Sequence, residues 1–376
     1  MQKKRIVLIF LVLVALIAGA FAVYYFFFKK PGVTVHEPVP GTEQPAPEGE
    51  NIVAIDEKLK GISATPAVSP VATADGARVL YAGKTNGIFE VDFNGGNQKE
   101  TTFTPLKNLY KIFWSKDRNE FAAVYANPDG RKTFYYNTQT KQTSPYDTHI
   151  DSLAFSPTEN KLAYHYQETG GGINNISVAD PSGANASTVI NTRLQEARIS
   201  WITQSEVALS TAPSGLAPNL LWVLNVSSQK LSTVLTDMYG LTTIWAPDGE
   251  RFLFSQTSQK GKGLSLSVAD KKGLSVKKLT PTTLPEKCVF AKDQKSIVCA
   301  APIIVPDIVW PDDYYKNLYN AQEQLWRINL VSGKKEMLYE FAATGFDAAN
   351  LILSPQEDIL VFLNKKDGLL YSVKLK

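Results

Sequence analysis

The sequence predicts an all-β fold: a seven-bladed β-propeller of four-stranded antiparallel blades, preceded by one transmembrane α-helix. Two observations predict it, a repeated strand-turn-strand phrase and an apolar segment near the N-terminus. In the repeat, an aromatic or apolar residue ends a short strand, a tight turn follows, and a second β-rich run begins. The clearest copy is residues 245–249 (WAPDG) followed by residues 251–254 (RFLF).

The spacing of this repeat predicts the number of blades. The landmark residues that end the first strands are Ala72, Trp114, Phe155, Trp201, Trp245, Phe290 and Leu353. Successive landmarks are 42, 41, 46, 44, 45 and 63 residues apart. A period near 40 to 45 residues, built from four short strands, is typical of a propeller blade. Seven landmarks therefore predict seven blades.

The N-terminal segment predicts a membrane anchor. Residues 6–28 are 23 consecutive uncharged positions, and a helix of that length crosses the roughly 30 Å hydrocarbon core of a bilayer. Residues 3–5 are all basic, and only two lysines follow the segment. Because basic loops prefer the cytoplasm, we expect residues 1–5 inside and the rest of the chain outside, periplasmic or extracellular.

An alternative for this segment is a cleaved signal peptide. Residues 18–20 (AGA) resemble a small-residue cleavage site. The apolar run continues for eight residues beyond Ala20, which favours an uncleaved signal-anchor.

Residues 29–50 contain five prolines and almost no large apolar residue after Val39, which predicts an extended linker. At ~3.1 Å per residue, about 20 residues of such a linker reach ~60 Å. The propeller is expected at residues 51–376. Its last copy ends after residues 369–375 without an outer strand, so that edge needs a partner. Residues 51–59 (NIVAIDEKL) have the length and β-propensity to pair with it, and the alternative is that they extend the linker.

Charge and histidine content exclude several classes of function. The chain has 39 basic and 36 acidic residues, scattered through turns, so no nucleic-acid partner is expected. Three histidines, His36, His149 and His165, supply little material for a metal site, and we expect no cofactor. We also expect no catalytic residues, because the G-x-S-x-G nucleophile turn is absent from the sequence.

The longest gap between landmarks reflects an insertion of about 18 residues within 302–323, between the second and third strands of blade six. In propellers these loops emerge on the face that also carries the links between blades. The insertion is rich in aromatic and acidic residues, which suit binding of a partner. The candidates are Asp307, Trp310, Asp312, Asp313, Tyr314, Tyr315 and Tyr319. The alternative is that the aromatic residues pack down as a brace over the ring.

The two cysteines flank the first hairpin of blade six. If this hairpin keeps the register in which Trp245 faces Phe252, then Cys288 faces Cys299. Export would place the pair in an oxidising setting, where a disulfide is reasonable. Two reduced, buried cysteines are the alternative, because a directly cross-strand bridge is often strained.

Residues 245–270 and 155–180 resemble the repeats of TolB-like propellers, and the resemblance covers roughly residues 60–376. The shared residues form turns and fill the core, so the resemblance implies a fold and no chemistry. The Trp-Asp and Gly-His dipeptides of WD repeats are missing, so a WD-repeat-like subfamily fits less well. A Tol-system role is unsupported, because no α/β domain fits between the anchor and the propeller.

The predicted function is therefore a membrane-anchored, extracytoplasmic binding or scaffolding module for a protein or cell-envelope ligand. The alternative is an extracytoplasmic propeller hydrolase or lyase with a carboxylate-based site on the loop face. An enzyme needs a deep polar pocket with convergent acids, whereas a scaffold needs an exposed apolar patch.

Overall fold

The computed structural model describes residues 57–375, apart from 84–86, 103–107, 129, 171 and 343–344. The predicted cytoplasmic N-terminus, transmembrane helix and linker all lie outside these residues. Within the described part of the chain, no helix is long and apolar enough to cross a membrane.

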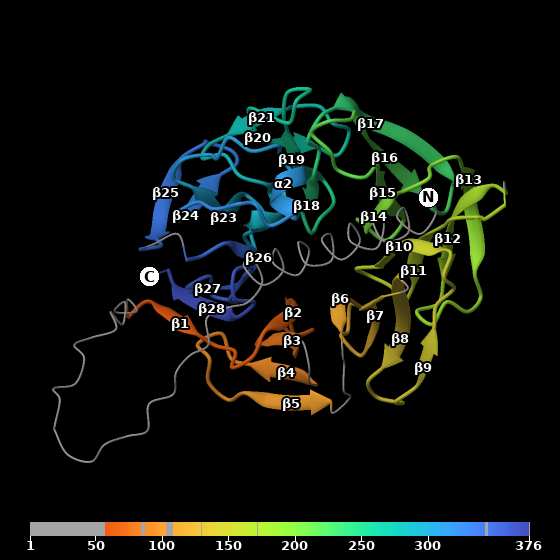
Figure 1. Cartoon of the computed structure of the whole chain (residues 1–376), viewed down its shortest axis with the longest axis horizontal. Coiled ribbons are helices and arrows are strands. Elements are labelled where there is room, and N and C mark those ends of the chain that lie inside the picture. Colours follow the sequence, from red (N-terminus) through yellow and green to blue (C-terminus); the bar gives the residue numbers. More distant parts are fainter. Residues whose placement is uncertain are drawn as a thin grey trace, which may run out of the picture. The chain divides into compact units, whose positions relative to one another are not determined.

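The described residues form seven four-stranded antiparallel sheets arranged in a ring around a common axis (Figure 1), which confirms the predicted propeller. Blade 1 contains β2 (Ala67–Ala72), β3 (Val79–Gly83), β4 (Ile88–Val91) and β5 (Lys99–Thr102). Blade 2 contains β6 (Leu109–Trp114), β7 (Glu120–Asn127), β8 (Gly130–Asn137) and β9 (Thr143–Pro145). Blade 3 contains β10 (Ile150–Phe155), β11 (Leu162–Tyr166), β12 (Asn174–Ala179) and β13 (Ser187–Thr192).

The remaining blades follow the same order from the axis outward. Blade 4 contains β14 (Arg198–Trp201), β15 (Glu206–Ser210), β16 (Asn219–Asn225) and β17 (Lys230–Met238). Blade 5 contains β18 (Thr243–Trp245), β19 (Arg251–Gln256), β20 (Ser265–Asp270) and β21 (Lys277–Leu279). Blade 6 contains β22 (Cys288–Phe290), β23 (Ser296–Pro302), β24 (Glu323–Asn329) and β25 (Lys335–Glu340), and blade 7 contains β26 (Ala348–Leu353), β27 (Ile359–Asn364), β28 (Leu370–Lys374) and β1 (Leu59–Gly61).

The hydrophobic core lies between neighbouring blades. Successive strand residues point to opposite faces of a sheet, so each blade presents one apolar face to each neighbour. In β19, Phe252 packs in a cluster with residues of blade 4, whereas Leu253 packs in a cluster with residues of blade 6. One such cluster joins each of the seven pairs of adjacent blades. This two-sided burial explains why the second strands are almost continuously apolar.

The repeated turn after each landmark also joins neighbouring blades. The turn of blade 5 places Gly249 at φ 71°, where an added Cβ would lie 2.4 Å from Cγ2 of Thr203 in blade 4. In the next blade, the side-chain oxygen of Gln294 accepts a hydrogen bond of 3.0 Å from the backbone N–H of Asp248. These turns form what we call the turn face, and the opposite face, which carries the links between blades, is the loop face.

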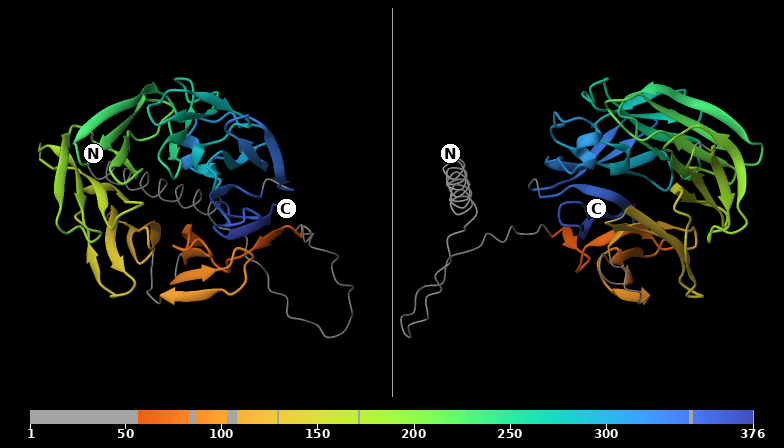
Figure 2. Two further views of the ribbon diagram at one scale, coloured as in Figure 1. Left: turned by 180° about the vertical axis from the view of Figure 1, so that it is seen from behind. Right: turned by 45° about the vertical axis from the view of Figure 1, so that its right-hand side comes forward.

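The ring closes by pairing its two ends. β1 pairs with β28, with Leu59 opposite Val373 and Gly61 opposite Tyr371. Both views in Figure 2 place the first strands of the propeller beside the last ones. An N-terminal outer strand for blade 7 was predicted within residues 51–59. Of these, Leu59 begins β1, residues 57–58 form a turn, and residues 51–56 lie outside the described residues. The side chain of Leu59 packs in the cluster between blades 6 and 7, which sets the position of the strand.

Closure can be tested at Leu59. Replacing it with Asp places an unpaired carboxylate in the cluster between blades 6 and 7, so the free energy of unfolding should fall by at least the ~2–5 kcal/mol typical of removing a buried leucine. Replacing the adjacent, exposed Lys60 with Ser should change it by less than about 1 kcal/mol. Urea unfolding of the detergent-solubilised chain measures both, and equal effects would show that β1 contributes little to closure.

Candidate functional site on the loop face

The predicted insertion connects β23 to β24, on the loop face of blade 6. The backbone N–H of Ile303 donates a 2.9 Å hydrogen bond to Gln322 O, so the two ends of the insertion lie side by side. The insertion contains one short helix, α2 (Asp312–Tyr315). In the view of Figure 1, α2 appears over the inner part of blades 5 and 6.

Three aromatic residues that we predicted to face a partner are buried instead. Trp310 and Tyr314 are each 2% exposed and Tyr319 is 5% exposed. Their rings stack on one another and pack against Leu264 and Leu284, which lie at the loop-face ends of blades 5 and 6. Their burial agrees with the alternative of a brace over the ring, because burying large apolar rings against the ends of two blades is more favourable than exposing them to water.

The predicted acidic residues of α2 also have structural partners. Asp312 accepts hydrogen bonds from the hydroxyl of Ser214 at 3.0 Å and from the N–H of Gly215 at 2.7 Å, both in blade 4. Asp313 accepts one from the N–H of Val309 at 2.8 Å. Gly215 allows this approach, since an added Cβ would lie 2.2 Å from the carbonyl oxygen of Trp310. The insertion is therefore held to the neighbouring blades.

Two predicted residues remain largely exposed. The side chain of Asp307 is 90% exposed and forms a 3.0 Å ion pair with Lys262. Tyr315 is 48% exposed, and its hydroxyl donates a 2.7 Å hydrogen bond to Glu286. Of the seven predicted residues, these two are therefore the ones whose side chains are most accessible to a partner.

A buried ion-pair network lies beneath the insertion, and the sequence reasoning did not find it. Lys287 ends η1 (Pro285–Lys287), the short helix that leads into β22, and its side chain is 1% exposed. Its ammonium lies 2.8 Å from the carboxylate of Glu323 and 2.5 Å from that of Asp347. It also donates a 2.8 Å hydrogen bond to the carbonyl oxygen of Ala348. The available sequence signal was a lysine next to a core cysteine. This signal does not identify the acidic residues that the lysine contacts.

The same carboxylates have further partners, so the network is well satisfied. Glu323 accepts hydrogen bonds from the hydroxyl of Tyr319 at 2.5 Å and from the N–H of Ala348 at 2.9 Å. Burial disfavours the ammonium of Lys287, but the charges of Glu323 and Asp347 outweigh it and raise the pKa of Lys287. Lys287 is therefore protonated at neutral pH and joins blade 6 to blade 7 and the insertion.

The cysteine pair lies next to this network. Cys288 pairs with Cys299 and Phe290 with Ile297, which is the predicted register. The two sulfur atoms form a disulfide, and both side chains are buried. The structure therefore contains the disulfide and not the alternative pair of reduced cysteines.

Polar side chains of the innermost strands remain exposed at the propeller axis. Lys111 of β6, Arg198 of β14 and Asn350 of β26 are exposed although their strands line the centre of the ring. The carboxylate of Asp151, on β10, is 25% exposed and lies 2.7 Å from Nδ1 of His165. Water therefore reaches the axis. His165 is fully buried in β11, as expected for a residue within a sheet.

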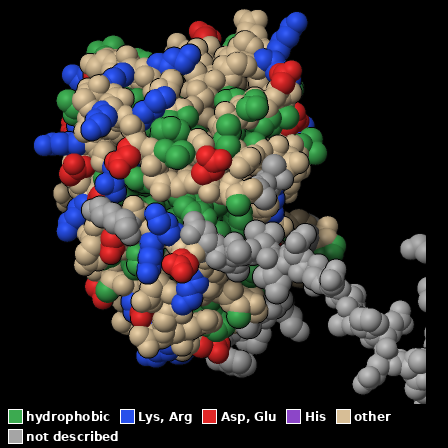
Figure 3. Space-filling view, turned by 90° about the vertical axis from the view of Figure 1, so that its left-hand side faces the viewer, with side chains coloured by type: hydrophobic (Ala, Val, Ile, Leu, Met, Phe, Trp, Pro, Cys, Tyr) green, Lys and Arg blue, Asp and Glu red, His purple; other side chains and the backbone are tan. Residues whose placement is uncertain are grey.

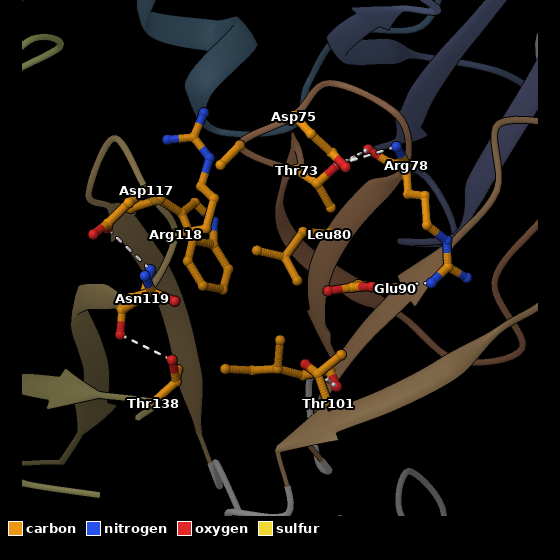
Figure 4. Close-up of a pocket in the computed structure, with 13 residues that line it drawn as sticks. Thr73, Asp75, Arg78, Leu80, Glu90, Thr101, Asp117, Arg118, Asn119 and Thr138 are labelled. Atoms are coloured by element: carbon orange, nitrogen blue, oxygen red, sulfur yellow. Dashed lines mark hydrogen bonds and ion pairs between the residues drawn. The ribbon is translucent and has the colours of Figure 1, made fainter. Parts of the chain in front are cut away.

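A separate cavity of about 470 Å³ lies between blades 1 and 2, close to the turn face (Figure 4). Trp114 and Leu80 contribute its apolar wall. On its polar side, Arg78 forms 2.9 Å ion pairs with Glu90 and Asp92. Arg78, Glu90 and Asp92 thus largely satisfy one another's charges. None of the seven residues predicted to bind a partner lines this cavity.

The described residues contain no group of three or more His, Cys, Asp and Glu side chains that could hold a metal ion. Figure 3 shows one side of the propeller, on which Lys and Arg alternate with Asp and Glu around small hydrophobic groups.

Comparison with known proteins supports the fold alone. No protein-family model matches the chain, and no curated protein sequence matches it either. Among solved structures, an oligogalacturonate lyase in complex with manganese is 14% identical with a TM-score of 0.60, over 85% of this chain and 93% of that one. The β-propeller domain of the Trilobed protease from Pyrococcus furiosus is 12% identical with a TM-score of 0.54, over 83% and 98%. TolB from Acinetobacter baumannii is 11% identical with a TM-score of 0.44, over 84% and 65%.

Proposed function

We propose that this chain is a membrane-anchored, extracytoplasmic binding or scaffolding module, and that it binds a protein partner on its loop face. One observation carries the proposal. Around the insertion the carboxylates are engaged in structural contacts, whereas several large apolar side chains stay exposed. This combination suits a contact surface better than a site for acid–base chemistry.

The acids near the axis have little capacity left for catalysis. Glu323 and Asp347 share the ammonium of Lys287. Glu286 accepts hydrogen bonds from the hydroxyls of Tyr315 and Thr242, at 2.7 and 3.1 Å. A catalytic carboxylate must reach the substrate, and these carboxylates are already engaged by groups of the fold.

Six of the exposed large hydrophobic residues belong to the insertion and to the loop of blade 4 that Asp312 contacts. We call them the insertion surface: Leu216, Ile303, Ile304, Val305, Tyr315 and Leu318. Ile304 is 80% exposed, Leu216 62% and Leu318 61%. The loop of Leu216 is held to α2 by the contacts of Asp312 described above. The insertion that carries most of these side chains is held by its buried aromatic cluster, so binding through them would cost less conformational entropy than binding through a free loop.

The anchor is supported by sequence alone. Residues 6–28 have the length and apolarity of a membrane span, and the basic residues before them favour export of the propeller. The Cys288–Cys299 disulfide agrees with this placement, because disulfides persist in oxidising compartments. The proline-rich residues 29–50 would separate the propeller from the bilayer.

A second candidate is an extracytoplasmic enzyme acting on an acidic substrate. Two of the similar structures are oligogalacturonate lyases, at 14% and 13% identity, which is a likeness of fold alone. The observation in this chain that favours the candidate is the exposure of Lys111 and Arg198 at the axis, where they could hold a substrate anion.

The binding role can be tested at Leu318. We expect Leu318→Asp to reduce chemical crosslinking to a partner in native membranes roughly tenfold, because an introduced charge at an apolar contact must be desolvated. Leu231, which is 45% exposed on the outer strand β17, provides the matched control, and Leu231→Asp should leave crosslinking unchanged. Mass spectrometry would identify and quantify the captured protein. Equal capture by both variants would exclude the insertion surface as the contact site.

A further inference from the structure

Two exposed cations occupy innermost strands on either side of blade 3. Lys111 lies on β6 and Arg198 is the first residue of β14. β10 lies between these strands and contacts both. The two cations therefore flank the same sector of the axis.

Neither cation has a carboxylate partner among the residues that the structure describes. The one carboxylate of β10, that of Asp151, is instead 2.7 Å from Nδ1 of His165. Glu286, on the other side of the axis, is hydrogen-bonded to Tyr315. The acids of the surrounding strands are thus engaged elsewhere, and the positive charges of Lys111 and Arg198 are left without a counter-charge.

Neighbouring positive charges act on Lys111. Partial desolvation, and then the positive charges of Arg198 and Arg131, lower the pKa of Lys111, whose side chain nevertheless stays accessible to solvent. Like charges gathered without an acid are unfavourable, and such arrangements are found at sites that bind anions.

Aromatic rings hold two of these cations in place. The ammonium of Lys111 lies 4.3 Å from the centroid of the Phe113 ring. The guanidinium of Arg131 lies 4.4 Å from the centroid of the Tyr110 ring. These contacts limit the motion of both side chains without neutralising them. Of the two cations of the proposed site, Lys111 is thus held in place by a neighbouring ring.

We propose that Lys111 and Arg198 bind one oxyanion, a carboxylate or a phosphate group, at the loop-face end of the propeller axis. This inference rests on the proposed function and names the chemistry of a ligand group that the loop face recognises. Arg198 can donate two parallel hydrogen bonds to such a group, and Lys111 supplies a point charge. The exposure of both side chains leaves them accessible to the ligand.

The test measures binding of two simple probes, glucuronate for the carboxylate and inorganic phosphate for the phosphate, to the detergent-solubilised full chain. Isothermal titration calorimetry at low ionic strength gives the dissociation constants, with glucose as the uncharged control ligand. We expect saturable binding of at least one anion and none of glucose. In the double variant Lys111→Gln and Arg198→Gln, the dissociation constant should rise at least roughly tenfold, because two charged donors are lost.

The matched control is the double variant Lys230→Gln and Lys272→Gln, which removes two exposed charges away from the axis and should bind like the unmodified protein. Equal affinity in the axis variant, or no saturable binding of either anion by the unmodified protein, would overturn the proposal. The outcome is separable from the proposed function. If partner capture depends on Leu318 but the protein binds no anion, only this inference is overturned. If the protein binds an anion but captures no protein, only the protein-binding role is overturned.

Discussion

Replacing Trp310 with Ala should lower the free energy of unfolding by about 3–5 kcal/mol, as is typical for a fully buried aromatic side chain. Trp310 is 2% exposed and packs with Tyr314 and Tyr319 against the ends of blades 5 and 6. The substitution leaves a cavity beneath the insertion and removes the indole N–H that donates to the carbonyl oxygen of Pro306 at 3.1 Å. Urea denaturation of the solubilised chain measures the change.

Tyr315 provides the control for this experiment, since it lies in the same insertion but is 48% exposed. Tyr315→Ala should cost less than about 1.5 kcal/mol, the value of one hydrogen bond, here that to Glu286. If Trp310→Ala were as mild as Tyr315→Ala, the brace would not stabilise the propeller, and the aromatic residues of the insertion would again become candidates for binding.

Replacing Lys287 with Met should have an effect of similar size, about 3–5 kcal/mol, because it leaves two buried carboxylates without their cation. Glu323 is fully buried and the side chain of Asp347 is 6% exposed. The loss should appear in urea unfolding at neutral pH. Lys316→Met, at a side chain that is 66% exposed, is the control and should change stability by less than about 1 kcal/mol.

A triple variant separates the charge effect from a packing effect. Adding Glu323→Gln and Asp347→Asn to Lys287→Met removes the unpaired negative charges, so much of the lost stability should return. No recovery in the triple variant would mean that the packing of the Lys287 side chain, rather than its charge, is what stabilises the junction of blades 6 and 7.

The regular parts of the fold could be predicted because they repeat. Trp245 and Phe252 face each other in the expected register, and the same local rule gave the pairing of Cys288 with Cys299. Both follow from strand alternation and tight-turn geometry over a few residues. Ring closure was also predictable in kind, because an unpaired edge strand needs a partner. The exact residues of the closing strand were not predictable, since several residues near Leu59 have similar β-propensity.

The candidate site was less predictable, because burial depends on residues far apart in the chain. Sequence placed an aromatic insertion on the loop face but left open whether Trp310 faces water or the protein. The structure decides this through Leu264 and Leu284, which lie outside the insertion at the ends of blades 5 and 6. The exposure of Tyr315 and Asp307 was likewise not predictable, because it depends on which side of the insertion faces solvent.

The sequence alone determined the seven-bladed repeat, the strand registers and the location of the insertion, since each depends on local periodicity and turn chemistry. Tertiary structure decided which charges are paired. Lys287 lies 60 residues from Asp347 in the chain, and only the junction of blades 6 and 7 brings their charges together. Lys111 and Arg198 are left without a carboxylate partner for the same reason, because the ring determines which strands meet at the axis. Electrostatic partners act through space, and a one-dimensional pattern contains no such distances.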